Sequence, residues 1–288
     1  MMIYEINCDS FELKDIFECG QCFRWNKDSN DTYTGIIDKC VINVEKIDKK
    51  IVFNGDIENA TQEEFEQIIK RYFDLDRDYE NIKNKLSKVD GYLKDSIKYG
   101  KGIRILNQNL WETIISFIIS ANNNIPRIKG IIEKICRKYG EELKWEGKIY
   151  YTFPTAKQLS NASVQDLRNL GLGFRDTRVF ETTRLIDRGI FDLGELYMMK
   201  TEFAKERLLT LPGVGPKVAD CILLFSDLKR FDVFPIDVWV RRVMNELYIH
   251  NDEEEKVNKK EIQKLANEKF GELQGIAQQY LFYWKREA

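Results

Sequence analysis

Two charged side chains, Lys217 and Asp237, stand where they could act together on a substrate. Lys217 follows the segment 211–216 (Leu-Pro-Gly-Val-Gly-Pro), and Asp237 follows 234–236, an apolar stretch turned by proline. A buried amine can form a Schiff base, and a nearby carboxylate can stabilise developing positive charge or help to deprotonate the amine. Simpler interpretations stay open, because Lys217 could contact a phosphate and Asp237 could cap the helix that follows it.

The elements around this lysine are predicted to be a helix, a tight hairpin and a second helix. Residues 203–211 carry apolar side chains at helical spacing, and Pro212, Gly213 and Gly215 interrupt them with a turn that needs glycine's dihedral freedom. Pro216 suits the first position of the second helix. The free amides at that helix start, together with the positive end of its dipole, favour a bound phosphate.

A hairpin of this sequence that ends in lysine and is followed by Pro-x-Asp resembles the lysine-bearing, bifunctional branch of the helix-hairpin-helix DNA glycosylases. Within that superfamily the chain is most similar to the 8-oxoguanine DNA glycosylases. The matching motifs run in order along nearly the whole chain, at 20–25, 116–118, 122–125 with Arg127, 171–175 and 278–282. The resemblance implies removal of 8-oxoguanine from duplex DNA by base flipping, with Lys217 as the nucleophile at C1′, Asp237 beside it, and associated AP-lyase activity.

The resemblance also implies a pocket for the flipped base. Cys221 and Phe282 would sandwich the base, Pro235 would line the pocket, Gln278 would meet the Watson–Crick edge, and the Gly20 carbonyl would accept a hydrogen bond from N7–H. Guanine has no hydrogen at N7, so a buried carbonyl would stay unpaired at a cost of about 1–3 kcal/mol. Without the resemblance, Phe282 would be interpreted as a core residue and Gln278 as a surface residue of a helix.

Other matching residues would contact DNA outside the pocket. Asn122, Arg127 and Arg175 would read the orphaned cytosine, and Phe174 would fill the emptied place in the base stack. Two positions depart from eukaryotic members, which have tyrosine at Phe174 and histidine at Trp239. The residues expected at the DNA backbone are Gly213, Gly215, Val218 and Trp239.

Attack by Lys217 requires a neutral amine. From a reference pKa near 10.4, deprotonation at pH 7 costs roughly 4–5 kcal/mol. Burial and the N-terminus of the second helix are both expected to lower the pKa of Lys217, and to offset this cost only if the pocket is dry when substrate is bound.

Composition and charge bound the class of protein. The 288 residues are 43% hydrophobic with a net charge of −2, so positive charge for DNA must be concentrated on one face. No membrane-spanning run or export signal is visible, which predicts a cytoplasmic location without membrane contact. Duplex DNA is the expected partner, and a monomer is expected.

Cysteine and histidine usage argues against most metal chemistry. The six cysteines are scattered, as expected for reduced thiols, and none follows Cys221, which excludes a four-cysteine iron–sulfur cluster after the catalytic region. His250 is the single histidine, so histidine-based metal sites and Ser/His triads are excluded. No cofactor is expected to be required. By resemblance, the hairpin carbonyls of Leu209, Leu211 and Val214 are a candidate site for a structural cation.

The predicted fold is α+β, with an N-terminal antiparallel sheet and helices followed by a mostly helical core. Strands are expected at 33–37, 40–44 and 50–53, with a turn at 54–55. Helices are expected at 61–73, 79–99, 110–120, 125–139, 155–159, 164–170, 175–188, from 193 onward, 203–211, from 216 onward and 238–247. The domains are expected to be residues 1–100, 101–203 and 204–288.

Two other functions stay open on the sequence. One is a helix-hairpin-helix glycosylase that removes alkylated bases with an activated water, in which Lys217 would not be essential for base release. The other is a non-catalytic DNA-binding module whose hairpin only grips phosphate. That module would give no reason for the Gly20 segment, Asp237 and the 278–282 helix to occur together.

Overall fold

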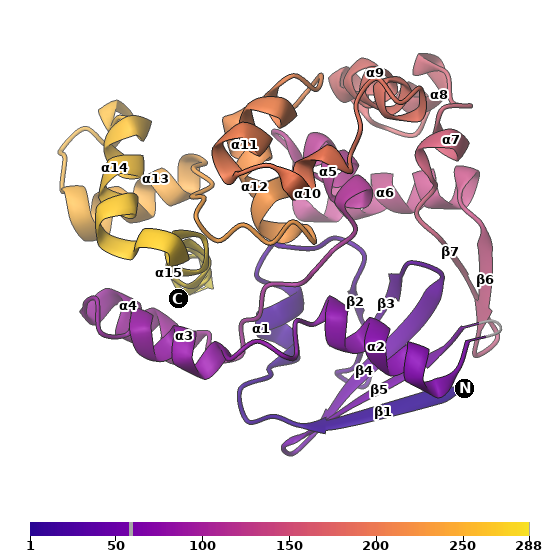
Figure 1. The fold of residues 1–288 in the computed structure, drawn as a ribbon, viewed down its shortest axis with the longest axis horizontal. Coiled ribbons are helices and arrows are strands. Elements are labelled where there is room, and N and C mark those ends of the chain that lie inside the picture. Colours follow the sequence, from indigo (N-terminus) through magenta and orange to yellow (C-terminus); the bar gives the residue numbers. More distant parts are fainter. Residues whose placement is uncertain (58–59, 288) are drawn as a thin grey trace.

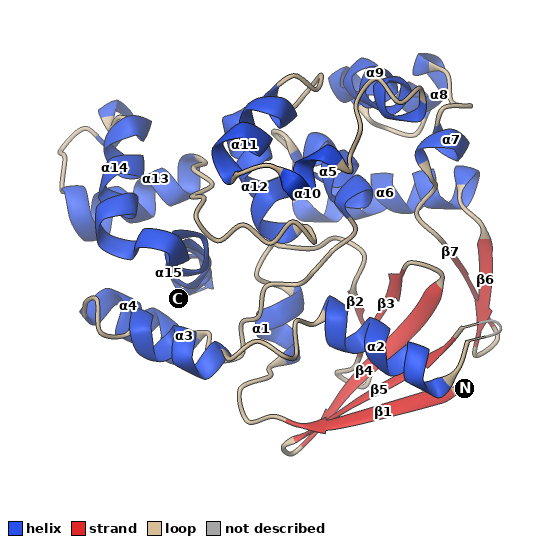
Figure 2. Ribbon diagram, in the orientation of Figure 1, coloured by secondary structure: helices blue, strands red, loops and turns tan. Residues whose placement is uncertain are grey.

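The computed structural model describes residues 1–57 and 60–287, with an antiparallel sheet near the N-terminus and a larger helical part beside it (Figures 1 and 2). The sheet has five strands in the order β1-β5-β4-β3-β2, and all neighbouring strands are antiparallel. The strands are β1 (Met2–Asn7), β2 (Asn26–Lys27), β3 (Tyr33–Ile37), β4 (Cys40–Ile47) and β5 (Lys50–Asp56). The predicted α+β class is confirmed.

Alternating apolar side chains of the central strands form the core beneath the sheet. Successive residues of a strand point to opposite faces, so every second residue of β4 and β5 enters the core. Helices α1 (Leu13–Phe17) and α2 (Gln62–Tyr72) supply the apolar side chains opposite them. The main members of this core are Ile16, Phe17, Ile42, Val44, Ile51, Phe53, Phe65, Ile69 and Phe73.

Several sequence-based predictions about this part are wrong. Asn54 and Gly55 do not form a turn, because β5 continues through them and pairs with β1, a strand that the sequence did not indicate. The helix expected over 79–99 is two helices, α3 (Tyr79–Leu86) and α4 (Gly91–Tyr99). A two-stranded hairpin of β6 (Glu142–Trp145) and β7 (Lys148–Tyr151) was also missed.

The helical part is close to the prediction. The buried central helix is α5 (Leu110–Ser120), and α12 and α9 pack against it. The next helices in chain order are α6 (Ile125–Tyr139), α7 (Ala156–Leu159), α8 (Val164–Asn169), α9 (Asp176–Asp187), α10 (Glu195–Met198), α11 (Thr201–Leu209) and α12 (Pro216–Phe225).

Three further helices bring the C-terminal part back to the N-terminal part. They are α13 (Val238–Met244), α14 (Lys259–Phe270) and α15 (Gln274–Glu287). α13 is shorter than predicted, because the backbone widens into a π turn at Asn245–Ile249. α15 lies against α4, so the C-terminal helix shares a core with a helix of the N-terminal part (Figure 1). The three-domain division expected from the sequence stays a prediction.

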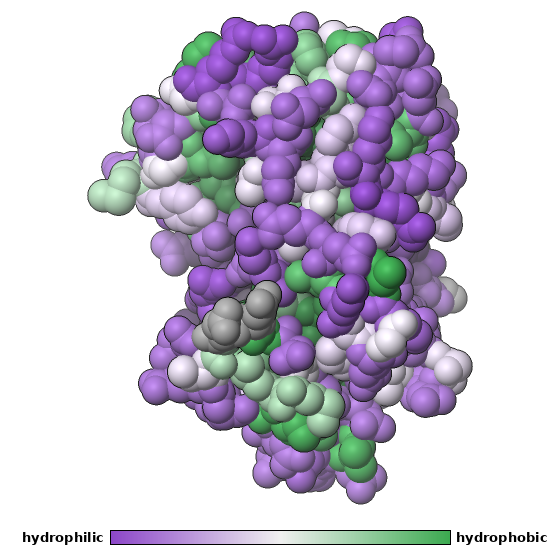
Figure 3. Space-filling view, turned by 90° about the vertical axis from the view of Figure 1, so that its right-hand side faces the viewer, coloured by the Kyte–Doolittle hydropathy of each residue, from purple (hydrophilic) through white to green (hydrophobic). Residues whose placement is uncertain are grey.

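The surface is dominated by polar residues. Hydrophilic side chains cover most of the face that includes α7 to α9 and the β6–β7 hairpin, and the hydrophobic areas there are small and separate (Figure 3). Within the part of the chain that the structure describes, no helix combines the length and apolar character needed to cross a bilayer.

Close packing at Gly35 gives a stability prediction. A Cβ at Gly35 would lie 2.4 Å from Trp25 Cδ2, and the indole is held because its Nε1 donates to the Tyr72 hydroxyl at 2.9 Å. We therefore expect Gly35→Ala to lower the free energy of unfolding by about 1–3 kcal/mol. Gly130→Ala in α6 meets nothing within 4 Å, and it should raise that free energy by up to about 1 kcal/mol. Urea denaturation followed by circular dichroism measures both, and equal stability of the two variants would contradict the packing argument.

Candidate active site

The helix-hairpin-helix predicted around Lys217 is present as α11, the turn at 210–215 and α12. Gly213 adopts a positive φ of 87°, and a Cβ there would come within 3.0 Å of Arg178. The Thr182 hydroxyl donates to the carbonyl of Pro212 at 2.9 Å and holds the turn against α9. Both contacts fix the direction in which α12 starts.

The start of α12 is open to a ligand. Gly215 is the N-cap residue and provides no side-chain hydrogen bond. The first amide that donates within the helix is that of Ala219, to the carbonyl of Gly215 at 2.9 Å. The amides of Lys217 and Val218 come before it and therefore have no acceptor within the helix. The Val218 side chain is buried, so a backbone phosphate could be bound by its amide but not by its side chain.

A pocket of about 60 Å³ lies beside this helix start. It brings together every residue predicted for catalysis and for the lesion base, namely Gly20, Lys217, Cys221, Pro235, Asp237, Gln278 and Phe282. Its other lining residues are Cys19, Phe117, Phe225, Val240 and Gln279. None of these five was assigned a role from the sequence, although Phe117 and Gln279 lie within the matching motifs 116–118 and 278–282.

The charge state of Lys217 differs from the expectation. Burial by itself lowers the pKa of this amine, but the neighbouring Cys221 sulfur and the Asp237 carboxylate favour the ammonium, and the net pKa is raised. Lys217 Nζ also lies 5.4 Å from the centroid of the Phe117 ring, a position that suits a cation. The expected lowering of the pKa is therefore wrong for the free protein, in which Lys217 is protonated at neutral pH.

Cys221 and Asp237 surround this amine with different chemistry. Burial raises the pKa of the Cys221 thiol to about 11, so the sulfur is neutral at pH 7. Asp237 is the N-cap of α13, and its Oδ1 accepts from the Val240 amide at 2.8 Å. Because Oδ2 takes no part in this bond, the capping role and a role beside the amine are compatible.

The Gly20 segment is fixed by buried hydrogen bonds. Gly20 has a positive φ of 89°, which favours glycine. Next to it, the buried Gln21 amide donates to the carbonyls of Ile16 and Arg104, both at 2.8 Å, and accepts from the Leu106 amide at 2.9 Å. The pocket wall that includes Gly20 is thus a rigid part of the fold.

Gln108 joins that wall to α12. Its side-chain Nε2 donates to the backbone carbonyls of Gln21 at 2.7 Å and Phe225 at 3.0 Å. The backbone carbonyl of Gln108 also accepts from the Asp227 amide at 2.8 Å. One side chain therefore bridges the Gly20 segment and the C-terminal end of the helix that carries Lys217.

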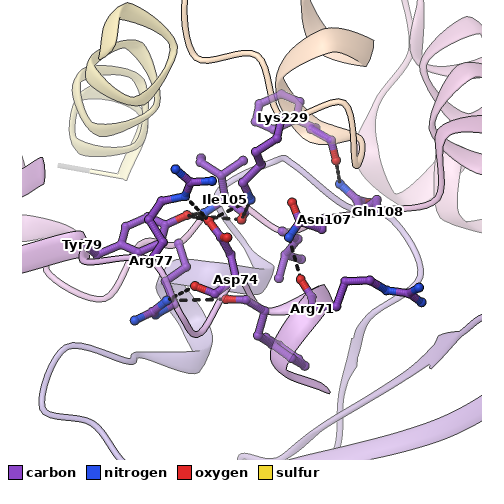
Figure 4. A network of polar contacts seen from close by, with 12 residues as sticks. Arg71, Asp74, Arg77, Tyr79, Ile105, Asn107, Gln108 and Lys229 are labelled. Atoms are coloured by element: carbon purple, nitrogen blue, oxygen red, sulfur yellow. Dashed lines mark hydrogen bonds and ion pairs between the residues drawn. The ribbon is translucent and has the colours of Figure 1, made fainter. Parts of the chain in front are cut away.

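A neighbouring polar network strengthens the same junction (Figure 4). Lys229, just beyond α12, donates to the Ile105 carbonyl and lies 3.3 Å from Asp74, which also accepts from Arg77 and Tyr79. Burial lowers the pKa of Lys229 to about 7, against the favourable effect of Asp74. The network holds the loop after α12 against the loops that follow α2 and α4.

Gln278 has an unused acceptor. Its side chain is 5% exposed, and its Oε1 is buried without a hydrogen-bond partner in the part of the chain that the structure describes. A buried polar atom is normally paired, so an acceptor left open in a pocket wall suits a ligand donor. The Watson–Crick edge of a guanine-type base carries such donors.

The residues expected near the opposite base also lie together. The Arg175 guanidinium donates to the carbonyls of Ala121, Asn122 and Leu172, and Arg127 donates to the Gly171 carbonyl at 3.2 Å. Arg175 is 2% exposed, so in the free protein it holds the turn that presents Asn122. The exposed side chains available to DNA on this side are Asn122, Arg127 and Phe174.

Phe174 is held between two cations. Its ring is 55% exposed, with the Arg175 guanidinium carbon 4.2 Å and that of Arg178 5.2 Å from the ring centroid. Trp239 is similarly exposed, on α13, where the Arg242 guanidinium carbon lies 5.3 Å from its ring. Two exposed aromatic side chains with neighbouring cations suit stacking on DNA.

Comparison with known proteins identifies the family. A family model described as HhH-GPD superfamily base excision DNA repair protein matches residues 115–270, more than half of the chain. The chain belongs to the HhH-GPD superfamily. The model for the N-terminal domain of 8-oxoguanine DNA glycosylase matches residues 3–114. Together the two models cover residues 3–270, which include the helix-hairpin-helix and most of the sheet but not the pocket residues Gln278, Gln279 and Phe282.

Individual members of the superfamily align over most of the chain. An N-glycosylase/DNA lyase of Saccharomyces cerevisiae is 32% identical over 270 residues, which are 84% of this chain and 70% of the relative. The structure of MBOgg1 with a low-affinity DNA ligand has a TM-score of 0.93 and 42% identity, covering 100% of this chain and 96% of that one. The 8-oxoguanine glycosylase/lyase of Clostridium acetobutylicum, in complex with DNA containing cytosine opposite 8-oxoG, has a TM-score of 0.90 and 44% identity, covering 100% and 98%.

Asp220 is a buried charge that the sequence analysis missed. It precedes Cys221 on α12 and is 3% exposed, and its Oδ1 lies 2.6 Å from Lys205 Nζ on α11. Lys205 is the ion-pair partner of this carboxylate, and no hydrogen bond from another described residue reaches Oδ1. Burial raises the pKa of Asp220 to about 6, despite the opposing effect of Lys205.

The raised pKa of Asp220 predicts that this residue makes the free energy of unfolding depend on pH. In the unfolded chain an aspartate titrates near 3.9, so between about pH 4 and pH 6 the folded form binds the proton more tightly. The contribution of Asp220 to stability is present below this window and is lost as the pH rises through it. Relative to the unmodified protein, Asp220→Asn should gain up to about 3 kcal/mol in free energy of unfolding from about pH 4 to about pH 7.

Urea denaturation at a series of pH values measures this difference. In a Lys205→Met background the window should move to higher pH, because the ammonium that favours the carboxylate is gone. A stability difference that does not change with pH would show that Asp220 is charged at no unusual cost.

Proposed function

We propose that the chain is a bifunctional DNA glycosylase and AP lyase that excises 8-oxoguanine from duplex DNA. The observation that carries the proposal is the single pocket in which Lys217 and Asp237 meet the Gly20 segment, Phe282 and the open acceptor of Gln278. The substrate named for the Clostridium acetobutylicum relative supports the same base and the same opposite cytosine.

Base release in this proposal begins with a flipped nucleotide. The target base leaves the stack and enters between Cys221 and Phe282, while Phe174 fills the space that it leaves. The Gln278 Oε1 accepts from the Watson–Crick edge, and the Gly20 carbonyl accepts from N7–H. A base in the pocket excludes water from Lys217, which lowers the cost of the neutral amine below that in the free protein.

The chemistry then proceeds through a covalent intermediate. Lys217 first loses its ammonium proton to solvent with the help of Asp237. Its neutral Nζ then attacks C1′, the bond from C1′ to the base breaks, and the base leaves with that electron pair and takes up the proton that Nζ releases. Asp237 stabilises the positive charge that develops on the sugar. Opening of the sugar ring gives a Schiff base on Lys217, and β-elimination expels the 3′ phosphate before water releases the lysine.

Further details belong to the same proposal. Asn122 and Arg127 would read the orphaned cytosine, and Arg175 would act by holding Asn122. The free amides at the start of α12, with Gly213, Gly215 and Trp239, would bind the DNA backbone. A structural cation at the carbonyls of Leu209, Leu211 and Val214 stays a prediction, as do the monomeric state and the cytoplasmic location. The Leu211 carbonyl already accepts from the Val214 amide at 3.1 Å.

Borohydride trapping tests the proposed nucleophile. With a duplex carrying 8-oxoguanine opposite cytosine, the unmodified protein should give a covalent protein–DNA band, because borohydride reduces the Schiff base to a stable amine. Lys217→Gln should give none. Asp237→Asn should slow trapping by about 10²–10⁴-fold, the usual effect of removing a group that assists proton transfer or charge development. Lys264→Gln, at an exposed lysine of α14, is the matched control and should trap normally.

Two other outcomes would point to the alternatives. Base release without a trapped band, in the unmodified protein and in Lys217→Gln alike, would favour a glycosylase that activates water. No base release from any damaged duplex would favour a DNA-binding module without catalysis.

A further inference from the structure

One face of α15 contacts both the base pocket and the Gly20 segment. Gln278, Phe282 and Arg286 follow one another at intervals of four residues and therefore lie on one side of the helix. Gln278 and Phe282 line the pocket, whereas Arg286 does not. The Arg286 guanidinium carbon lies 5.2 Å from the centroid of the Phe282 ring. Arg286 thus supports the Phe282 ring from outside the pocket.

The same guanidinium holds the backbone beside Gly20. Its Nη2 donates to the carbonyl of Glu18, and its Nη1 lies 3.2 Å from the place where a Cβ of Gly20 would stand. Its Nε lies 3.0 Å from the Glu287 carboxylate. Arginine suits this position because its planar group presents several donors in a fixed arrangement, which lysine does not.

Gln279 makes the neighbouring contact. Its Nε2 donates to the carbonyl of Cys19 at 2.6 Å, and its side chain is 2% exposed. The carbonyls of two successive residues, Glu18 and Cys19, are therefore both bound by α15. The next carbonyl along the chain is that of Gly20, whose direction depends on these two anchored peptide groups.

We propose that Gln279 and Arg286 form a positioning clamp that sets selectivity for the damaged base. The clamp fixes the Gly20 carbonyl relative to the Phe282 ring, so that the carbonyl meets N7–H of a base stacked on that ring. A hydrogen bond tolerates only a few tenths of an ångström of displacement, and a looser segment would accept guanine and 8-oxoguanine more equally. This inference rests on the proposed function, and it adds two residues that touch neither the sugar nor the amine.

Binding selectivity tests the clamp directly. In a Lys217→Gln background, which blocks turnover, the dissociation constants are measured for duplexes carrying 8-oxoguanine or guanine opposite cytosine. Adding Arg286→Met, which keeps an apolar stem beside Phe282, should reduce the selectivity ratio by about 10-fold to 100-fold, the range expected when one buried hydrogen bond to the base is lost. Gln279→Ala should act in the same direction. Lys285→Met is the matched control, because Lys285 pairs with Glu246 at 2.5 Å, and it should leave the ratio unchanged.

Cleavage of abasic sites distinguishes a loss of base positioning from general misfolding of the variant. With Lys217 intact, Arg286→Met should cleave a preformed abasic site at the unmodified rate, since that substrate has no base to position. An unchanged selectivity ratio, or an equal loss of lesion binding, undamaged-DNA binding and abasic-site cleavage, would overturn the clamp. A Lys217→Gln protein without any preference for the lesion, together with an unmodified protein that releases no base, would instead reject the proposed function and the clamp with it.

Discussion

The hydrogen bonds of the Gln108 side chain fix the distance on which the pocket depends. The N-terminal part of the chain supplies Gly20, and α12 supplies Lys217, so the two sides of the pocket come from segments that are far apart in the sequence. Gln108 binds the carbonyl beside Gly20 and the carbonyl at the end of α12 with a single amide group. Because this amide is buried and its Nε2 donates to both parts, small displacements of either part would leave a donor unpaired. The sheet and the α4–α15 contact serve the site by making this junction rigid.

The helix-hairpin-helix was predictable from local patterns, whereas pocket residues such as Gln278 and Phe282 were predicted only through the resemblance to the 8-oxoguanine DNA glycosylases. Proline and glycine mark the turn before α12, and Asp237 stands directly before a helix that it caps. Non-local features were not predictable. Whether Asn54 and Gly55 turn or continue as a strand depends on pairing with β1, and the pKa of Lys217 depends on Cys221 and Asp237 across the pocket. The sequence also could not show that the Arg175 guanidinium is occupied by backbone carbonyls.

A chain with a net negative charge can still present a cationic face to DNA. Here two arginines surround the exposed ring of Phe174, and Arg178 also packs against the hairpin at Gly213. Phe174, the proposed wedge, and the turn proposed to bind phosphate are therefore connected through one side chain. Since acidic residues elsewhere keep the total charge near −2, electrostatic attraction acts close to the site and not over the whole surface.

The uncapped start of α12 has a thermodynamic consequence. A helix whose first amides lack acceptors loses order in its first turn more readily than one with a serine or aspartate cap. A phosphate of the duplex would supply the missing acceptors, so DNA would serve as the N-cap of the helix that carries Lys217. Binding and ordering of this turn are then linked: each stabilises the other by the same free energy. The nucleophile would be most firmly held only while a duplex occupies the hairpin.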